Sequence, residues 1–175
     1  MTRTALTIAR ASEELGWFRP LDWPDLAVAL LLEGSEDAEV AELAGLPPTV
    51  SGWDTDALVT PLYERYAIPS PTAEEAVGLL AATMAADLRA RPAVVTAPMV
   101  RALARLAPPA FQSALASQCY GAEEYLDCDC HPTVDETWMR DLEALPGPEV
   151  PDSIIEVLAR QLRSTMPTRQ PPRAH

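Results

Sequence analysis

The chain contains no lysine and no asparagine among its 175 residues, and its thirteen basic residues are all arginine. Both missing residues are encoded by AT-rich codons, so their absence indicates a gene from a GC-rich bacterium. Without lysine, the chain has no side chain for a P-loop or for a Schiff base with a carbonyl substrate. Because arginine is the only basic residue used, its presence at a position does not indicate selection for bidentate hydrogen bonding.

Aromatic residues are also scarce, at 6% of the chain, whereas alanine, leucine and valine are abundant. Alanine and leucine lose little side-chain freedom on entering a helix, so this composition favours helices over sheets. No segment alternates apolar and polar residues over the length of a strand. The predicted fold class is all-α, a single-domain bundle of about seven or eight short helices with short Pro-rich loops and no significant sheet.

No apolar run is long enough to span a membrane. The longest, Leu26 to Leu32, is far shorter than the roughly 20 residues that a spanning helix needs. The first ten residues lack the continuous apolar segment of a secretory signal. Three cysteines are an odd number, which fits a reduced protein better than a disulfide framework. The sequence therefore predicts a cytoplasmic protein without a membrane segment.

Proline, glycine and capping residues divide the chain into short helical segments. The predicted helices run from Asp22 to Glu33, from Ser35 to Ala44, from Asp54 through Pro61, from Ser70 to Arg89 or Ala90, from Thr96 to shortly before Pro108, from Ala110 to about Tyr120, from Thr133 to Leu145 and from Asp152 to Ser164. Pro61 is expected to kink or divide its helix, because proline removes a backbone donor.

Two of these predicted helices carry apolar residues at spacings of three and four, which places a stripe toward a core. The stripes consist of Val77, Leu80, Met84 and Leu88 in one helix and of Ile154, Ile155, Leu158 and Leu162 in the other. We expect one helical domain over residues 1–166. Residues 167–175 are rich in proline and arginine and are predicted to form a flexible tail.

The net charge is −13, and the charges are arranged in blocks. Acidic residues dominate residues 1–88 and 111–156, whereas residues 89–110 and 157–175 carry arginine and no acid. One interpretation is that the acidic surfaces are merely solvated and are softened by the basic blocks within the fold. The other is that an acidic face meets a basic partner, which would speed association. The sign of the charge argues against nucleic-acid binding.

All three cysteines and one of the two histidines gather in one run, at Cys119, Cys128, Cys130 and His131. Zinc takes four Cys or His ligands at a structural site, and this run supplies four. The spacing is tight, because one residue separates Cys128 from Cys130 and His131 follows at once. Alternatively, Cys119 packs as a small apolar side chain and the others belong to an acidic loop. A Cys128–Cys130 redox pair lacks the usual Cys-x-x-Cys spacing.

Catalytic signatures are absent from the sequence. It has no Gly-x-Ser-x-Gly nucleophile motif, no Gly-rich phosphate loop and no His-Glu-x-x-His zinc motif. His175 is the last residue given, which leaves His131 as the plausible catalytic histidine. Adjacent glutamates, such as Glu74 and Glu75, do not share one face of a helix and are better explained by the helix dipole. We therefore assign no catalytic residue.

The aromatic residues Trp17, Phe18, Trp23 and Trp53 could line a ligand pocket or form a partner-binding patch. Aromatic residues beside helix starts more often anchor a core, and we favour the core here. The predicted function is a non-catalytic acidic module that binds another protein with a basic surface, as an adaptor, an immunity-type inhibitor or a regulator would. The alternatives are a metalloprotein or enzyme centred on the Cys/His run, and a nucleic-acid mimic.

Overall fold

The computed structural model describes residues 1–47, 49–91 and 147–164. The helices are α1 (Thr2–Glu14), α2 (Trp23–Leu32), α3 (Ala38–Ala44), α4 (Gly52–Arg65), α5 (Ala73–Ala90) and α9 (Asp152–Ser164), with a 3-10 helix, η1 (Pro20–Asp22), before α2. These ranges contain no strand, which confirms the predicted all-α character for this part of the chain. None of its helices has the length and apolar composition of a membrane span.

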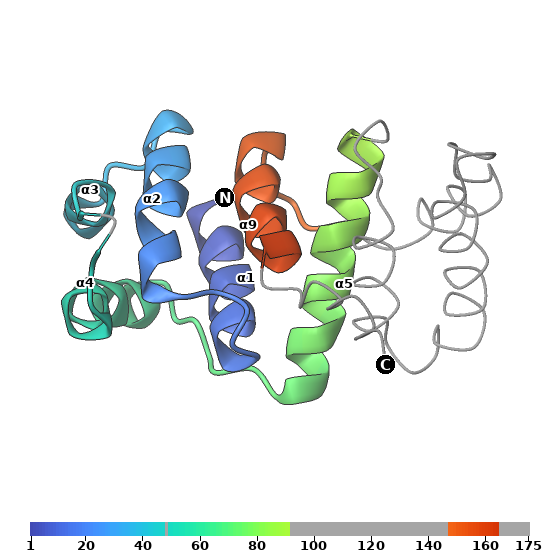
Figure 1. The fold of residues 1–175 in the computed structure, drawn as a ribbon, viewed down its shortest axis with the longest axis horizontal. Helices are drawn as coiled ribbons and strands as arrows, with labels where there is room; N and C mark the ends of the chain where they lie inside the picture. Colours follow the sequence, from blue (N-terminus) through green and yellow to red (C-terminus); the bar gives the residue numbers. More distant parts are fainter. Residues whose placement is uncertain (48, 92–146, 165–175) are drawn as a thin grey trace, which may run out of the picture.

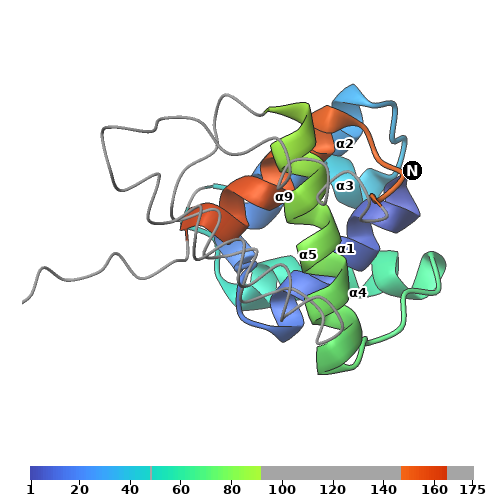
Figure 2. The same cartoon turned by 90° about the vertical axis from the view of Figure 1, so that its right-hand side faces the viewer.

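Helix α9 lies among helices of the N-terminal half although it is distant from them in the sequence. Figure 1 shows α1 and α9 near the centre, α2 and α5 on either side of them, and α3 and α4 beyond α2. Helix α9 contacts α1, α2 and α5, and Figure 2 shows α5 lying close to α1 and α9. Ion pairs join Arg91 to Glu156 at 3.6 Å and Arg160 to Asp25 at 3.4 Å. The described segments therefore share one core.

This core draws on all six α-helices. Its largest fully buried side chains are Leu6, Ile8, Trp23, Leu26, Leu30, Leu43, Leu62, Leu80 and Met84. Removing a side chain of this size from water stabilises the fold by about 1.5–3 kcal/mol. The predicted apolar stripes are confirmed at Leu80, Met84, Ile154, Ile155 and Leu158, which are buried, whereas Val77 is only half-buried. The side chains of Leu88 and Leu162 lie outside the described residues.

The sequence pattern did not predict α1, although this helix occupies the centre of the fold. Ala5, Ile8 and Ser12 recur at spacings of three and four, and all are buried. The helix ends at Glu14, and two residues later Gly16 has a φ of 70°, in the left-handed region that favours glycine. The backbone N–H of Trp17 closes the end by donating to the Ser12 carbonyl at 2.7 Å. Periodicity and the glycine together could have identified this helix.

Two helices start later than predicted. Helix α3 follows Asp37 rather than Ser35, and the Ser35 hydroxyl donates to the Asp37 carboxylate at 3.1 Å. Helix α5 follows Thr72 rather than Ser70. The Thr72 hydroxyl accepts the Glu75 backbone N–H at 3.3 Å, and the Glu75 carboxylate accepts the Thr72 backbone N–H at 2.8 Å. This reciprocal capping box satisfies two backbone donors at the start of α5.

Helix α4 starts earlier than predicted and is not divided. Ser51 caps it, and Asp54 is its third residue, where the carboxylate accepts the Ser51 hydroxyl at 2.7 Å. Pro61 lies inside the single helix. Of the two outcomes expected at Pro61, a kink or a division, the division is wrong and the kink stays a prediction. The prediction for α9 is confirmed, because its bounds are Asp152–Ser164 as expected.

We predict that Thr72→Ala lowers the free energy of unfolding by about 1 kcal/mol, because it removes the capping hydroxyl of α5. Thr49→Ala makes the same chemical change at an exposed turn residue and should lower it by less than about half of that. Urea denaturation of both variants measures the difference. Equal losses in the two would contradict the cap assigned to Thr72.

Candidate functional site

One side of α4 points away from the core along its whole length. Its exposed residues at helical spacing are Trp53, Asp56, Ala57, Thr60 and Glu64, and we call these five residues the outer face of α4. The opposite side buries Val59 and Leu62. Burial of that side fixes the rotation of the helix, so the outer face is a consequence of the core.

Trp53 begins the outer face and is 88% exposed. A tryptophan normally buries most of its large apolar surface, so this degree of exposure is unusual. Its neighbour Gly52 packs beside η1, since a Cβ on Gly52 would lie 3.7 Å from Pro20 Cγ. Leu21, the next residue of η1, is 45% exposed. We call Pro20, Leu21 and Trp53 the apolar patch, because all three are exposed and belong to η1 and the start of α4, which approach each other at Pro20 and Gly52.

The other predicted aromatic positions serve the core, as favoured from the sequence. Trp23 and Phe18 are buried, and their rings meet edge to face with centroids 5.1 Å apart. Trp17 is partly buried and packs against the same core. Trp53 is the exception, since the interpretation as a core anchor is wrong for it.

Three carboxylates of α4 follow Trp53 in the sequence, two of them on the outer face. Asp54, Asp56 and Glu64 are all exposed. Neither Asp56 nor Glu64 forms an ion pair with any residue that the structure describes. Two nearby arginines already have acidic partners, because Arg19 pairs with Asp22 at 3.3 Å and Arg65 of α4 pairs with Glu39 of α3. Asp54, Asp56 and Glu64 therefore present negative charge that no ion pair with a described residue neutralises.

Arg65 fixes α4 against α3. Its guanidinium donates to Asp37 at 2.7 Å and also to Glu39. The Tyr66 hydroxyl donates to the other Asp37 oxygen at 2.7 Å. Burial raises the pKa of Asp37, but the hydrogen bonds from Tyr66 and Arg65 outweigh it and hold this pKa below its ordinary value. The carboxylate is thus kept ionised and α4 is kept in place.

On its inner side, α4 is held by Glu13 of α1, which is partly buried. One Glu13 oxygen accepts the Trp23 indole N–H at 2.9 Å, and the other accepts the Tyr63 hydroxyl at 2.8 Å. Burial raises the pKa of Glu13 and outweighs the opposing effect of these hydrogen bonds. Burial and the adjacent Glu13 carboxylate also raise the pKa of Tyr63. We call Glu13, Trp23 and Tyr63 the carboxylate bridge, because it joins α1, α2 and α4.

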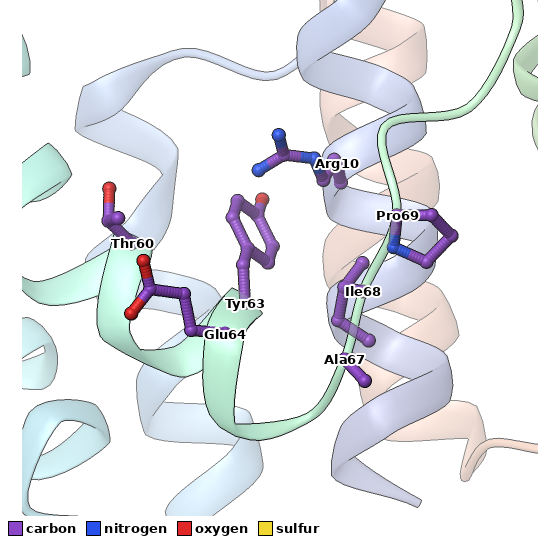
Figure 3. Close-up of a pocket in the computed structure, with 7 residues that line it drawn as sticks. All are labelled: Arg10, Thr60, Tyr63, Glu64, Ala67, Ile68 and Pro69. Atoms are coloured by element: carbon purple, nitrogen blue, oxygen red, sulfur yellow. The ribbon is translucent and has the colours of Figure 1, made fainter.

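A pocket of about 390 Å³ opens at the C-terminal end of α4. Figure 3 shows its lining residues, which are Arg10, Thr60, Tyr63, Glu64, Ala67, Ile68 and Pro69. Ala67 turns the chain here with a φ of 49°, a left-handed conformation that costs a non-glycine residue about 1 kcal/mol. The turn brings Ile68 and Pro69 to the wall of the pocket.

The residues of the predicted metal site, Cys119, Cys128, Cys130 and His131, lie outside the described residues, as does the predicted tail 167–175. Within residues 1–47, 49–91 and 147–164, no group of three or more His, Cys, Asp or Glu side chains is placed to hold a metal ion. The zinc site therefore stays a prediction. The chain matches no family model, no curated protein and no solved structure.

The carboxylate bridge predicts a specific pH dependence of stability. The folded state holds the Glu13 proton more tightly than the unfolded state, so losing this proton destabilises the fold. We expect the free energy of unfolding of the wild type to fall relative to that of Glu13→Gln as the pH rises above 4.5, which is the ordinary pKa of a glutamate side chain. Urea denaturation across this range measures the difference. Glu14→Gln, an exposed neighbour on the same helix, is the control. A wild-type advantage that grows with pH would refute the prediction.

Proposed function

We propose that the protein is a non-catalytic acidic helical module that binds another protein through the outer face of α4 and the apolar patch. An adaptor, an immunity-type inhibitor or a regulator would act in this way. The observation that carries the proposal is the exposed Trp53, which is 88% accessible and is bordered by carboxylates without ion-pair partners among the described residues.

Trp53 has the properties of an interface anchor. Tryptophan is enriched among the few residues that dominate binding energy, and such residues lie inside a rim that excludes water. The side chain begins a helix that is fixed on its other sides, by Arg65 toward α3 and by Tyr63 toward α1. Because the backbone under the indole is already ordered, binding would lose little conformational entropy there.

The charge of this surface defines the partner. Asp54, Asp56 and Glu64 would face arginine or lysine side chains around an apolar cleft that receives the indole. Exposed charges of this kind raise the association rate and select the partner more than they raise affinity. A nucleic-acid mimic would present carboxylates without an apolar centre, so the apolar patch favours a protein partner. The metalloprotein alternative stays a prediction on residues 119–131.

The test begins with purification of the protein from its source organism at moderate salt, followed by calorimetric titration of the purified partner. We expect Trp53→Ala to weaken binding by about tenfold or more. Leu32→Ala is the matched control, because Leu32 is 80% exposed at the end of α2 remote from η1. Leu32→Ala should leave the affinity for the partner within about twofold of that of the wild type. Equal losses in the two variants would place the interface elsewhere.

Charge reversal tests the rim separately. The double variant Asp56→Arg with Glu64→Arg should lower the association rate about tenfold at low salt and much less at high salt, because exposed charges are screened. Glu149→Arg reverses an exposed charge before α9 and serves as the control. Stopped-flow mixing measures both rates. A rate that does not change in the double variant, or failure to recover any partner at stoichiometric level, would remove the basis of the proposal.

A further inference from the structure

Arg10 is a partly buried cation that interacts electrostatically with Glu13 but forms no ion pair with the residues that the structure describes. Arg19, Arg65, Arg91 and Arg160 each form an ion pair. Arg10 forms none with the residues that the structure describes, and its Nε is buried without a hydrogen-bond partner there. A cation removed from water normally has a compensating anion or a full set of acceptors.

The guanidinium of Arg10 is nevertheless held in a defined position. Its Cζ lies 4.3 Å from the centroid of the Tyr63 ring, and one Nη donates to the Ser70 hydroxyl at 2.6 Å. Tyr63 is fixed in turn by its hydrogen bond to Glu13. A cation that is ordered before a ligand arrives costs less to use in binding.

The rest of the pocket supplies two further kinds of contact. Figure 3 shows Thr60 and Glu64 on one side of the Tyr63 ring and Ala67, Ile68 and Pro69 on the other. One side thus offers a hydroxyl and a carboxylate, and the other is apolar. A volume of about 390 Å³ suits a small molecule rather than a folded chain.

The charges around the pocket restrict the ligand. Arg10 attracts a negative group, but Glu64 lines the same pocket. Two further carboxylates are close by, because Glu13 interacts electrostatically with both Arg10 and Asp56. A dianion such as phosphate would be repelled by these carboxylates. A ligand with one negative and one positive group would satisfy both Arg10 and Glu64.

We propose that this pocket binds a small apolar α-amino acid, with its carboxylate on Arg10, its ammonium on Glu64 and its side chain along Ala67, Ile68 and Pro69. The site shares Thr60 and Glu64 with the outer face of α4 but does not use Trp53. Trp53→Ala should therefore leave amino-acid binding unchanged, which distinguishes failure of this site from failure of the proposed partner binding.

The test is a titration of the full chain with L-leucine in which NMR chemical shifts of the backbone amides measure binding. We expect saturable shifts at residues 60–69 at millimolar ligand. L-leucinamide lacks the carboxylate and N-acetyl-L-leucine lacks the ammonium, so each should bind about tenfold more weakly. Similar binding of either analogue would overturn the proposal, as would the absence of saturable shifts with leucine, valine and phenylalanine.

Variants separate the site from the fold. Arg10→Gln should weaken leucine binding about tenfold or more, whereas Arg3→Gln removes the same charge from an exposed position of α1 and should change nothing. Glu64→Gln, at an exposed position, should weaken binding severalfold without affecting folding. If Arg10→Gln does not fold, Arg10→Lys and Glu64→Gln decide the question. Unchanged leucine affinity in both Arg10→Lys and Glu64→Gln would overturn the assignment. So would a loss of leucine affinity in Arg3→Gln equal to that in Arg10→Gln.

Discussion

The carboxylate of Glu13 connects three helices through two hydrogen bonds. Its oxygens accept from Trp23 of α2 and Tyr63 of α4, while the residue itself belongs to α1. Withdrawing a carboxylate from water is unfavourable, as the raised pKa of Glu13 shows. The arrangement persists because the buried indole and phenol donors would otherwise lack acceptors, at a cost of about 1–3 kcal/mol each. Together with the burial of Val59 and Leu62 and the contacts of Arg65 with Asp37 and Glu39, this polar contact holds the orientation of α4 and with it the outer face.

Ion pairs elsewhere neutralise some acidic side chains of the surface and leave others without a cationic partner among the described residues. Arginines pair across the junctions α3–α4, α5–α9 and α2–α9, where helices from different parts of the chain meet. Each exposed pair contributes at most about 1 kcal/mol to stability. Their larger consequence is electrostatic, because they neutralise the positive charge of Arg65, Arg91 and Arg160. The outer face of α4 retains its carboxylates without such partners, and the apolar patch lies at its start.

The sequence predicted those features that depend on neighbouring residues. Helix α2 ends within one residue of the predicted boundary at Glu33, and Gly34 follows with a φ of 87°, a conformation that few residues other than glycine tolerate. The first residue of a helix was predicted less accurately where two possible N-cap residues lie close together in the sequence. Ser70 precedes a proline, yet Thr72 caps α5 because Glu75 completes its capping box. Helix α1 escaped prediction because Met1 gives it no capping side chain.

The candidate site could not be predicted, because its residues come from helices far apart in the sequence. Fifty positions separate Glu13 from Tyr63, and no local spacing indicates their contact. Trp53 also resembles any other aromatic residue at a helix start until the packing of α4 shows which side is covered.

Tyr63 takes part in both the carboxylate bridge and the pocket, which links the interior to the surface. Its hydroxyl binds Glu13 inside, and its ring supports the guanidinium of Arg10 outside. The Tyr63 ring under the cation is therefore held in place by its hydrogen bond to a carboxylate behind it. Arg10 also makes the ionised form of Glu13 more favourable, which lowers the pKa that burial raises. By reciprocity, a ligand that neutralises Arg10 would raise the pKa of Glu13 further, so occupancy of the pocket and protonation of the carboxylate bridge are coupled.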